Sequence, residues 1–253
     1  MKILNAVIAH KDFEWNDLSQ DDLAKFLVFT PNDIKTNLPN VCKYKEIDGY
    51  DNRLYSELSH LKYIRENIDF DWIVINHYRR RFELPDYKNV YVPAPVKFND
   101  KIKNLYGIFH YGSDLDLMTD IIMDSELEDS FKLEWLKSLN DDKMICYNMM
   151  SGPKELYYDL TDTCFMLLDR FKQLRRFTNY DKVVKFYTKV KKDKDENNLK
   201  VNTHEPFRVF GFLNERLTNC YFRWYSNKHN NIMNLNNPVS PCKVKLLEEG
   251  MVL

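Results

Sequence analysis

The feature of this sequence that most constrains its fold is a strand, helix, strand order in its first third. The segments Ile3–Ala9 (ILNAVIA) and Trp72–Asn76 (WIVIN) are short apolar runs rich in β-branched residues, which is typical of buried strands. Between them, apolar residues recur at helical spacing from Leu54 to Ile68. This order predicts a mostly parallel sheet covered by helices, because parallel neighbouring strands need a crossover connection.

The composition predicts a folded protein of the cytoplasm. The chain has 253 residues, of which 44% are hydrophobic and 14% aromatic, enough for a sizeable core. We find no internal repeat or linker and expect a single domain over residues 1–253. The net charge of -1 provides no global attraction to nucleic acid or to an anionic membrane, so such a contact would need a local basic patch. No segment resembles a signal peptide or a membrane span, and the five cysteines form no C-x-x-C pair, so reduced thiols are expected.

The middle of the chain changes from strand-like to helical patterns. Asn89–Phe98 is an extended segment that its two prolines confine to a sheet edge or a loop. An amphipathic helical pattern begins at Ser113 and breaks near Asp124 or Ser125. Met144–Met150 is apolar enough to form another strand. The C-terminal half is therefore predicted to be rich in helices.

A long helix and a charged run are expected next. Ser151-Gly152-Pro153 closes the preceding strand, and a helical pattern then runs from Lys154 to Phe177. Lys189–Lys200 carries many charges and no apolar face, which predicts an exposed loop or a disordered excursion.

The last predicted helix follows Pro206 and has two distinct stripes. Its apolar side consists of Phe207, Phe210, Leu213, Leu217 and Tyr221, and the opposite stripe consists of Arg208, Gly211, Glu215 and Asn219. A glycine within a helix costs about 1 kcal/mol relative to alanine, so Gly211 predicts the close approach of a ligand or a backbone. Glu215 would then face whatever approaches.

The strand Trp72–Asn76 runs directly into the basic cluster HYRRR, residues 77–81. In open α/β sheets ligands bind beyond the carboxyl ends of the strands, so a cluster at this place predicts an anion site. Spacing alone favours a simpler interpretation, in which the three arginines form surface salt bridges and His77 caps the strand.

Four segments match a known pattern in the same order along nearly the whole chain. They are YSELSHLKYIREN, DWIVINHYRRRF, NMMSGPKELYYD and FRVFGFLNERLTN. The most specific pieces are Tyr-x-Glu-Leu at 55–58, His-Tyr-Arg-Arg at 77–80 and Arg-x-x-Gly-Phe-x-x-Glu-Arg-Leu at 208–217. Together they resemble the domain found in bacterial capsular-polysaccharide and O-antigen glycosyltransferases.

The resemblance implies an α/β, GT-A-like fold, a Rossmann-related mixed sheet flanked by helices with a helix-rich C-terminal half. A nucleotide-sugar-binding part would cover about residues 1–110 and an acceptor and catalytic part about residues 111–253. Two segments depart from the family pattern. The loop before the first helix is shortened to Asp51-Asn52, and the family's His-rich stretch is reduced to His110 and Tyr111.

Many GT-A enzymes carry an Asp-x-Asp at this strand end, where it holds a divalent metal against the leaving diphosphate. Because HYRRR occupies that place here, the resemblance favours Arg79 and Arg80 as the groups that neutralise the diphosphate. No cofactor or metal is then needed. Bound Mn²⁺ or Mg²⁺ is the alternative, held by acids such as Asp51 or the pair Asp114 and Asp116.

The resemblance, joined with these patterns, gives a set of candidate residues. The catalytic group comprises Glu215 as the base together with Arg79 and Arg80. The donor-binding group comprises His10, Lys11, Asp51, Asn52, Tyr55, Glu57, His77, Tyr78, Arg208 and Gly211, and the acceptor side comprises His110, Asp114, Asp116 and Asn148. Simpler roles are open for several: helix capping for Asp51 and Asn52, a favourable helix dipole for Glu57, and a surface ion pair for Glu215.

Three functions fit these features. The first is a glycosyltransferase that moves a sugar from a UDP-linked donor to a surface polysaccharide or lipid-linked glycan, with a peripheral membrane contact through the basic segments RFKQLRRF and KVVKFYTKVKK. The second is a phage DNA glycosyltransferase that adds a sugar, such as a pentose, to hydroxymethylated cytosine. The third is a nucleotide-sugar-binding module without catalysis.

Overall fold

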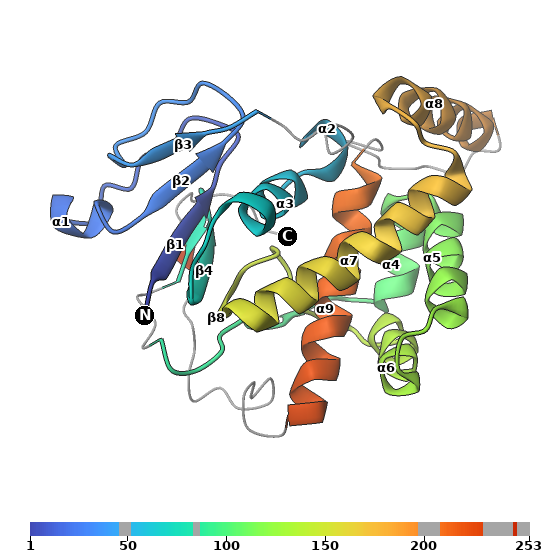
Figure 1. Ribbon diagram of the computed structural model, residues 1–253. Coiled ribbons are helices and arrows are strands. Elements are labelled where there is room, and N and C mark those ends of the chain that lie inside the picture. The colour runs from blue at the N-terminus through green and yellow to red at the C-terminus, as the bar shows by residue number, and fades with distance from the viewer. Residues whose placement is uncertain (46–51, 83–86, 197–207, 230–244, 247–253) are drawn as a thin grey trace.

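The computed structural model describes residues 1–45, 52–82, 87–196, 208–229 and 245–246. A twisted sheet lies on one side of the molecule and a group of helices on the other (Figure 1). The main sheet has the strand order β3-β2-β1-β4-β5-β9, and β8 pairs with β4 as well.

The centre of the sheet is parallel, as predicted. Strand β1 (Ile3–Ile8) pairs in parallel with β4 (Trp72–His77) and with β2 (Leu27–Thr30), which in turn pairs with β3 (Val41–Lys43). Successive residues of β1 enter different cores, because side chains alternate across a strand. The carboxyl ends of β1 and β4 therefore meet at one edge of the sheet.

Beyond β4 the sheet becomes antiparallel. Strands β5 (Arg80–Arg81) and β8 (Met150–Pro153) both pair with β4, and β9 (Lys245–Leu246) pairs with β5. A separate two-stranded sheet joins β6 (Val96–Lys97) to β7 (Lys143–Met144). The prediction of a strand over Met144–Met150 was wrong: its middle is a loop, and the following Ser-Gly-Pro belongs to β8.

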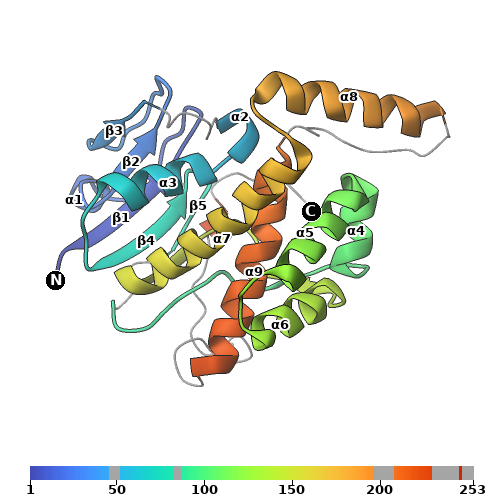
Figure 2. The same ribbon diagram turned by 45° about the vertical axis from the view of Figure 1, so that its right-hand side comes forward.

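Nine helices lie within the described residues. They are α1 (Gln20–Leu23), α2 (Asn52–Tyr55), α3 (Leu58–Asn67), α4 (Ile102–Phe109), α5 (Gly112–Asp124), α6 (Asp129–Leu139), α7 (Lys154–Arg175), α8 (Tyr180–Glu196) and α9 (Val209–His229). Helix α9 lies behind α7, with α4, α5 and α6 on the side away from the sheet (Figure 2). It packs against α2, α6 and α7, and most of its residues from Val209 to Phe222 are buried, whereas Glu215 is partly exposed. Phe207 of the predicted apolar side lies outside the described residues.

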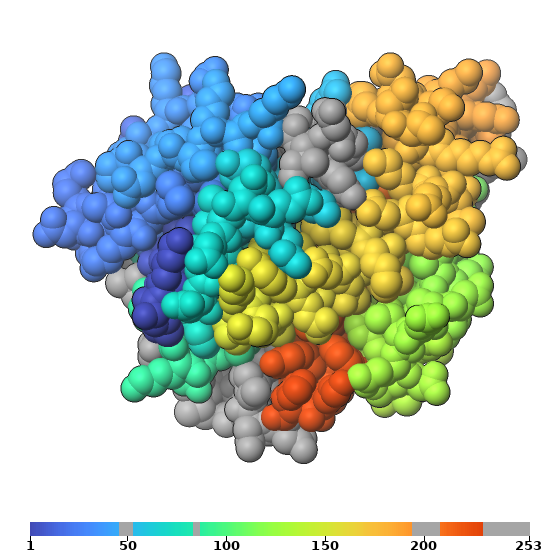
Figure 3. Space-filling model, viewed as in Figure 1, coloured from blue at the N-terminus to red at the C-terminus, as the bar shows by residue number. Residues whose placement is uncertain are grey.

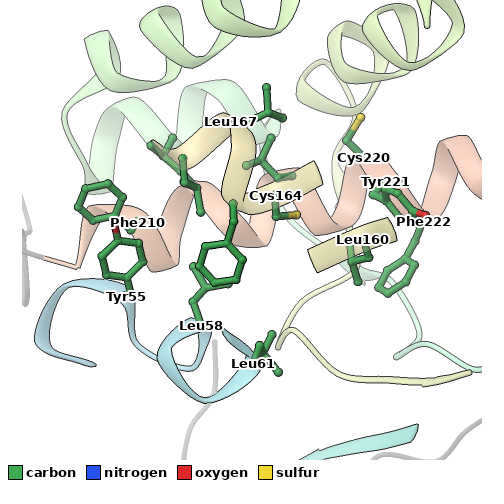
Figure 4. Packing of buried hydrophobic residues seen from close by; sticks show 14 of the residues in the cluster. Tyr55, Leu58, Leu61, Leu160, Cys164, Leu167, Phe210, Cys220, Tyr221 and Phe222 are labelled. Carbon is green, nitrogen blue, oxygen red and sulfur yellow. The ribbon is translucent and has the colours of Figure 1, made fainter. Parts of the chain in front are cut away.

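The helices pack through one large apolar core that reaches the sheet. Helix α7 crosses the front surface between α3 and α5 (Figure 3) and buries its inner side chains. Where α2 meets α9, the Tyr55 ring stacks on Phe210 with ring centroids 4.4 Å apart (Figure 4). Tyr55 is fully buried, so its place in the structure is that of a core residue.

The charged run Lys189–Lys200 is not a loop over its described part. Residues 189–196 continue α8, and residues 197–200 lie outside the described residues. The start of this helix is anchored by the buried Val183 and Tyr187. Lysine and glutamate are good helix formers, so the helix extends past its anchors without an apolar face.

Two further observations bear on earlier expectations. In the part of the chain that the structure describes, no helix combines the length and the apolar character required for a membrane span. Cys42, Cys146, Cys164 and Cys220 are free thiols.

Gly211 of α9 is explained by a close approach of the chain at Ser56. A Cβ atom at this position would lie 2.9 Å from Ser56 Oγ and 3.1 Å from Ser56 Cβ. Ser56 itself has a φ of 51°, in the left-handed region, so the connection between α2 and α3 is already constrained there. The predicted close approach is thus made by protein.

Gly211→Ala is expected to destabilise the fold by about 1 to 3 kcal/mol because the added methyl group overlaps Ser56. Chemical denaturation would measure the change. Gly107→Ala in helix α4 is the matched control. A Cβ atom added at Gly107 would meet no atom within 4 Å outside the nearby backbone of its own helix, so this change should stabilise the fold by up to about 1 kcal/mol. Adding Ser56→Gly to Gly211→Ala should restore stability, and failure of this rescue would contradict the explanation.

Candidate active site

The basic cluster forms a tight turn at the carboxyl end of β4. His77 pairs with Arg80 across the turn, so Tyr78 and Arg79 occupy its tip. The Asn76 side chain braces it, because its Oδ1 accepts from the Phe82 N–H at 2.8 Å and its Nδ2 donates to the Ala6 carbonyl at 3.2 Å. We call residues 77–80 the arginine turn.

His77 joins the arginine turn to the start of helix α3. Its Nδ1 accepts a hydrogen bond from the Arg79 backbone N–H at 3.2 Å. The proton of a neutral ring is therefore on Nε2, which lies 3.4 Å from Glu57 Oε1. Burial alone would raise the pKa of Glu57, but the hydrogen bond from His77 opposes it and the pKa is lowered to about 2. Glu57 is thus a fixed carboxylate beside the turn.

This lowered pKa predicts a pH dependence of stability. Because the pKa of Glu57 falls from 4.5 to about 2 on folding, its contribution is present above pH 4.5 and is lost as the pH falls toward 2. The shift corresponds to about 3 kcal/mol. We expect the difference in free energy of unfolding between the unchanged protein and Glu57→Gln to shrink over this range. Urea denaturation at several pH values would measure it, with Glu126→Gln, at an exposed glutamate, as the control. A difference independent of pH would contradict the pairing.

His10 follows β1 and lies beside the arginine turn. Its ring centroid is 5.0 Å from that of Tyr78 and 6.4 Å from that of His77. Burial lowers the pKa of His10 to about 4; the charge of Glu57 opposes this shift, while Arg208 adds to it. His10 is therefore neutral at pH 7 and offers a hydrogen bond, not a charge.

Glu215 projects from α9 toward this group. Its pKa is raised by burial and by Glu57, against the opposing effects of Arg216, the Tyr147 backbone N–H and Arg80. Its Oε2 lies 3.1 Å from Arg216 Nη1, and its side chain is 28% exposed. A half-buried carboxylate with a raised pKa is suited to accept a proton.

The arrangement includes three more residues, which are not among the candidates from the sequence. Tyr147 lies under Arg80, with the guanidinium carbon 3.9 Å from the ring centroid. Arg216 is nearly buried and places a further cation beside Glu215. His60 of α3 is buried with its Nε2 3.1 Å from the Ala9 carbonyl, which ties α3 to the end of β1. Only Arg216 carried a signal, as a neighbour of Glu215 in the family motif.

The structure brings some of the candidate residues together and leaves others apart. His10, Glu57, His77, Tyr78, Arg79, Arg80, Arg208 and Glu215 come together around the arginine turn. Asn148 lies beside them, where its Oδ1 accepts from Asn214. Lys11 is exposed, Asn52 begins α2, and Asp51 lies outside the described residues.

The central acceptor-side candidates have structural partners. Asp114 is buried, lies 2.6 Å from Arg175 Nη2 and accepts from the Tyr187 hydroxyl at 2.6 Å, which ties α5 to α7 and α8. His110 stacks on Phe212 with centroids 4.0 Å apart. Asp116 is exposed on α5.

The arrangement combines guanidinium donors with two carboxylates of different character. Arg79 and Arg80 on the turn, with Arg208 directly before α9 and Arg216 on it, can bind the oxygens of an anion. Glu57 is held ionised, while Glu215 has the higher proton affinity. Within the described residues, no three His, Cys, Asp or Glu side chains gather as a metal site requires.

Comparisons with known proteins identify a similar fold. No protein-family model matches the chain, and no curated protein matches it. A solved structure of the bifunctional glycosyltransferase WbbM in its apo form matches with a TM-score of 0.60 and 14% identity, over 90% of this chain and 43% of that one. This chain has a glycosyltransferase-like fold. The likeness confirms the predicted GT-A-like mixed sheet flanked by helices, and the chain spans less than half the length of that structure.

Proposed function

We propose that this protein is a glycosyltransferase that moves a sugar from a nucleotide-diphosphate sugar to an acceptor hydroxyl. The observation that carries the proposal is the arginine turn at the carboxyl end of β4, beside Glu215 of α9, in a glycosyltransferase-like fold. In sheets of this kind, ligands bind at this edge. A uridine donor is proposed from the resemblance of the sequence segments.

In the proposed reaction, Glu215 and the two arginines of the turn have separate roles. Glu215 takes the proton of the acceptor hydroxyl, whose oxygen attacks the anomeric carbon of the donor sugar. The bond from that carbon to the diphosphate oxygen breaks, and its electron pair leaves with the nucleotide diphosphate. Arg79 and Arg80 stabilise this developing charge with fixed donors that do not depend on pH. The proposed reaction is a direct, inverting displacement that needs no metal.

The donor proposal is tested by calorimetry with uridine diphosphate, a UDP-sugar and the free sugar. Because the arginine turn holds the diphosphate, both nucleotides should bind much more tightly than the sugar. Equal affinity for the free sugar would contradict the role of the turn.

For the acceptor we favour a surface polysaccharide or lipid-linked glycan over hydroxymethylated cytosine in DNA. Helix α8 carries the exposed lysines Lys182, Lys185 and Lys189 at helical spacing on one side. This basic face suits anionic lipid headgroups around a lipid-linked glycan, and DNA phosphates as the second candidate. Mass spectrometry of nucleosides from phage or host DNA after co-expression separates the two: a glycosylated nucleoside would establish the DNA acceptor.

A binding module without catalysis is the remaining alternative. It would bind a UDP-sugar and release no diphosphate in the presence of any acceptor. The presence of Glu215 together with the arginine turn favours the enzyme, because loss of this carboxylate with retention of the turn would be the mark of a binding module.

A further inference from the structure

The loop between β7 and β8 has an unusual backbone. Tyr147 has a φ of 82° and Asn148 a φ of 49°, so two successive residues other than glycine adopt left-handed conformations. Such residues persist only where the surrounding structure holds them, and they are concentrated at functional sites.

Two side chains of α9 hold this loop. Asn219 Oδ1 accepts from the Ile145 N–H at 2.9 Å, and Asn214 Nδ2 donates to Asn148 Oδ1 at 2.9 Å. Glu215 lies between these two side chains on the same helix, next to Asn214. The loop that contains Tyr147 is thus attached to the helix that carries the proposed base.

The side chain of Tyr147 is attached to the arginine turn. The Arg80 guanidinium carbon lies 3.9 Å from the centroid of its ring, close enough for a strong cation–π contact. Arg80 is 8% exposed, so water competes little with this contact. Tyr147 therefore contacts Arg80 and belongs to a loop that is tied to the helix of Glu215.

We propose that Tyr147 is a positioning residue that fixes Arg80 relative to Glu215, and this inference rests on the proposed function. The distance between base and phosphate-binding group must match the donor and acceptor, and small misplacements of such groups are costly. The left-handed backbone at 147–148 places the Tyr147 ring under Arg80 while Asn148 stays bonded to Asn214 of α9. A ring used only for packing would instead contribute to stability without affecting nucleotide affinity.

The first measurement is the NMR signal of the Arg80 Nε–H, assigned by its loss in Arg80→Lys. In the unchanged protein the Tyr147 ring should shift this signal upfield. An unshifted signal would overturn the inference without the need for any variant at Tyr147.

The second measurement is the affinity for uridine diphosphate of Tyr147→Leu, Tyr147→Met and Tyr147→Phe. The first two remove the ring and should weaken binding about tenfold, whereas phenylalanine keeps the ring and should stay within about twofold. Tyr158→Leu is the matched control, because Tyr158 lies under Arg65 at 3.7 Å at the contact of α3 with α7. It should leave the affinity unchanged.

The outcomes separate this inference from the proposed function. If the unchanged protein binds no uridine diphosphate, the proposed function is overturned and this inference with it. If it binds but folded Tyr147→Leu or Tyr147→Met binds equally well, only the positioning role is overturned. Loss of affinity in all three Tyr147 variants, phenylalanine included, would also overturn it, because the ring would then not be the group that acts.

Discussion

Glu215→Gln is expected to reduce sugar transfer by about 10²- to 10⁴-fold while the affinity for uridine diphosphate changes by less than about twofold. Glutamine has nearly the same shape but cannot take the proton of the acceptor hydroxyl. The arginine turn, which holds the diphosphate, stays in place. A loss of turnover without loss of donor binding is the mark of a group that acts on the acceptor.

The pH profile adds a second signature. Because burial raises the pKa of Glu215 above that of an ordinary glutamate, transfer should increase as the pH rises through this higher pKa. The residual activity of Glu215→Gln should not show this increase with pH. The matched control is Glu134→Gln, at a buried glutamate paired with Arg223 on the far part of α9. It should affect stability and not turnover, and an active Glu215→Gln enzyme would contradict the assignment of the base.

Arg80→Ala is expected to slow transfer by about 3 kcal/mol, or about a hundredfold, through the loss of one well-placed electrostatic donor. Arg80→Lys should recover only part of this, since a point charge does not reproduce the bidentate fork of a guanidinium group. Steady-state kinetics with saturating donor would measure both variants.

The control for this variant is another stacked arginine. Arg65 lies over the Tyr158 ring and pairs with Asp162 at 2.9 Å, away from the turn, so Arg65→Ala should leave transfer unchanged. Full activity of Arg80→Ala would show that the leaving diphosphate is stabilised by other groups.

The parts of the fold with a strong local pattern could be predicted from the sequence. Strands β1 and β4 are continuous apolar runs, and α7 has a long amphipathic repeat, so their identity does not depend on the rest of the chain. Strands β2 and β3 are four and three residues long, which is too short for a clear pattern.

The two wrong element predictions have different causes. Met144–Met150 has a strand-like composition, but its tethers to Asn214 and Asn219 of α9 impose left-handed residues in its middle. Lys189–Glu196 lacks an apolar face, yet α8 continues through it from the anchors Val183 and Tyr187. Distant contacts thus overrode the local pattern in the first segment, whereas in the second the good helix formers lysine and glutamate continue a helix that is anchored one to two turns earlier.

The arginine turn could be predicted from the sequence, but the residues that surround it could not. A strand that ends in HYRRR places the arginine turn at a sheet edge, where ligands bind. Which other residues reach the turn depends on the approach of α9 and of the loop at 145–149, which lie far along the chain. Tyr147 therefore escaped the sequence analysis. Asp114 was proposed from its place in the central segment, and its buried partners Arg175 and Tyr187 could not be predicted from spacing.

The central claim is that the arginine turn neutralises the leaving diphosphate in place of a metal. The measurement that tests it most directly is the rate of sugar transfer in the presence of a strong chelator. We expect transfer to continue at an unchanged rate, because guanidinium groups stay charged and in place without a cation. Activity that is lost in chelator and restored by Mn²⁺ or Mg²⁺ would contradict it.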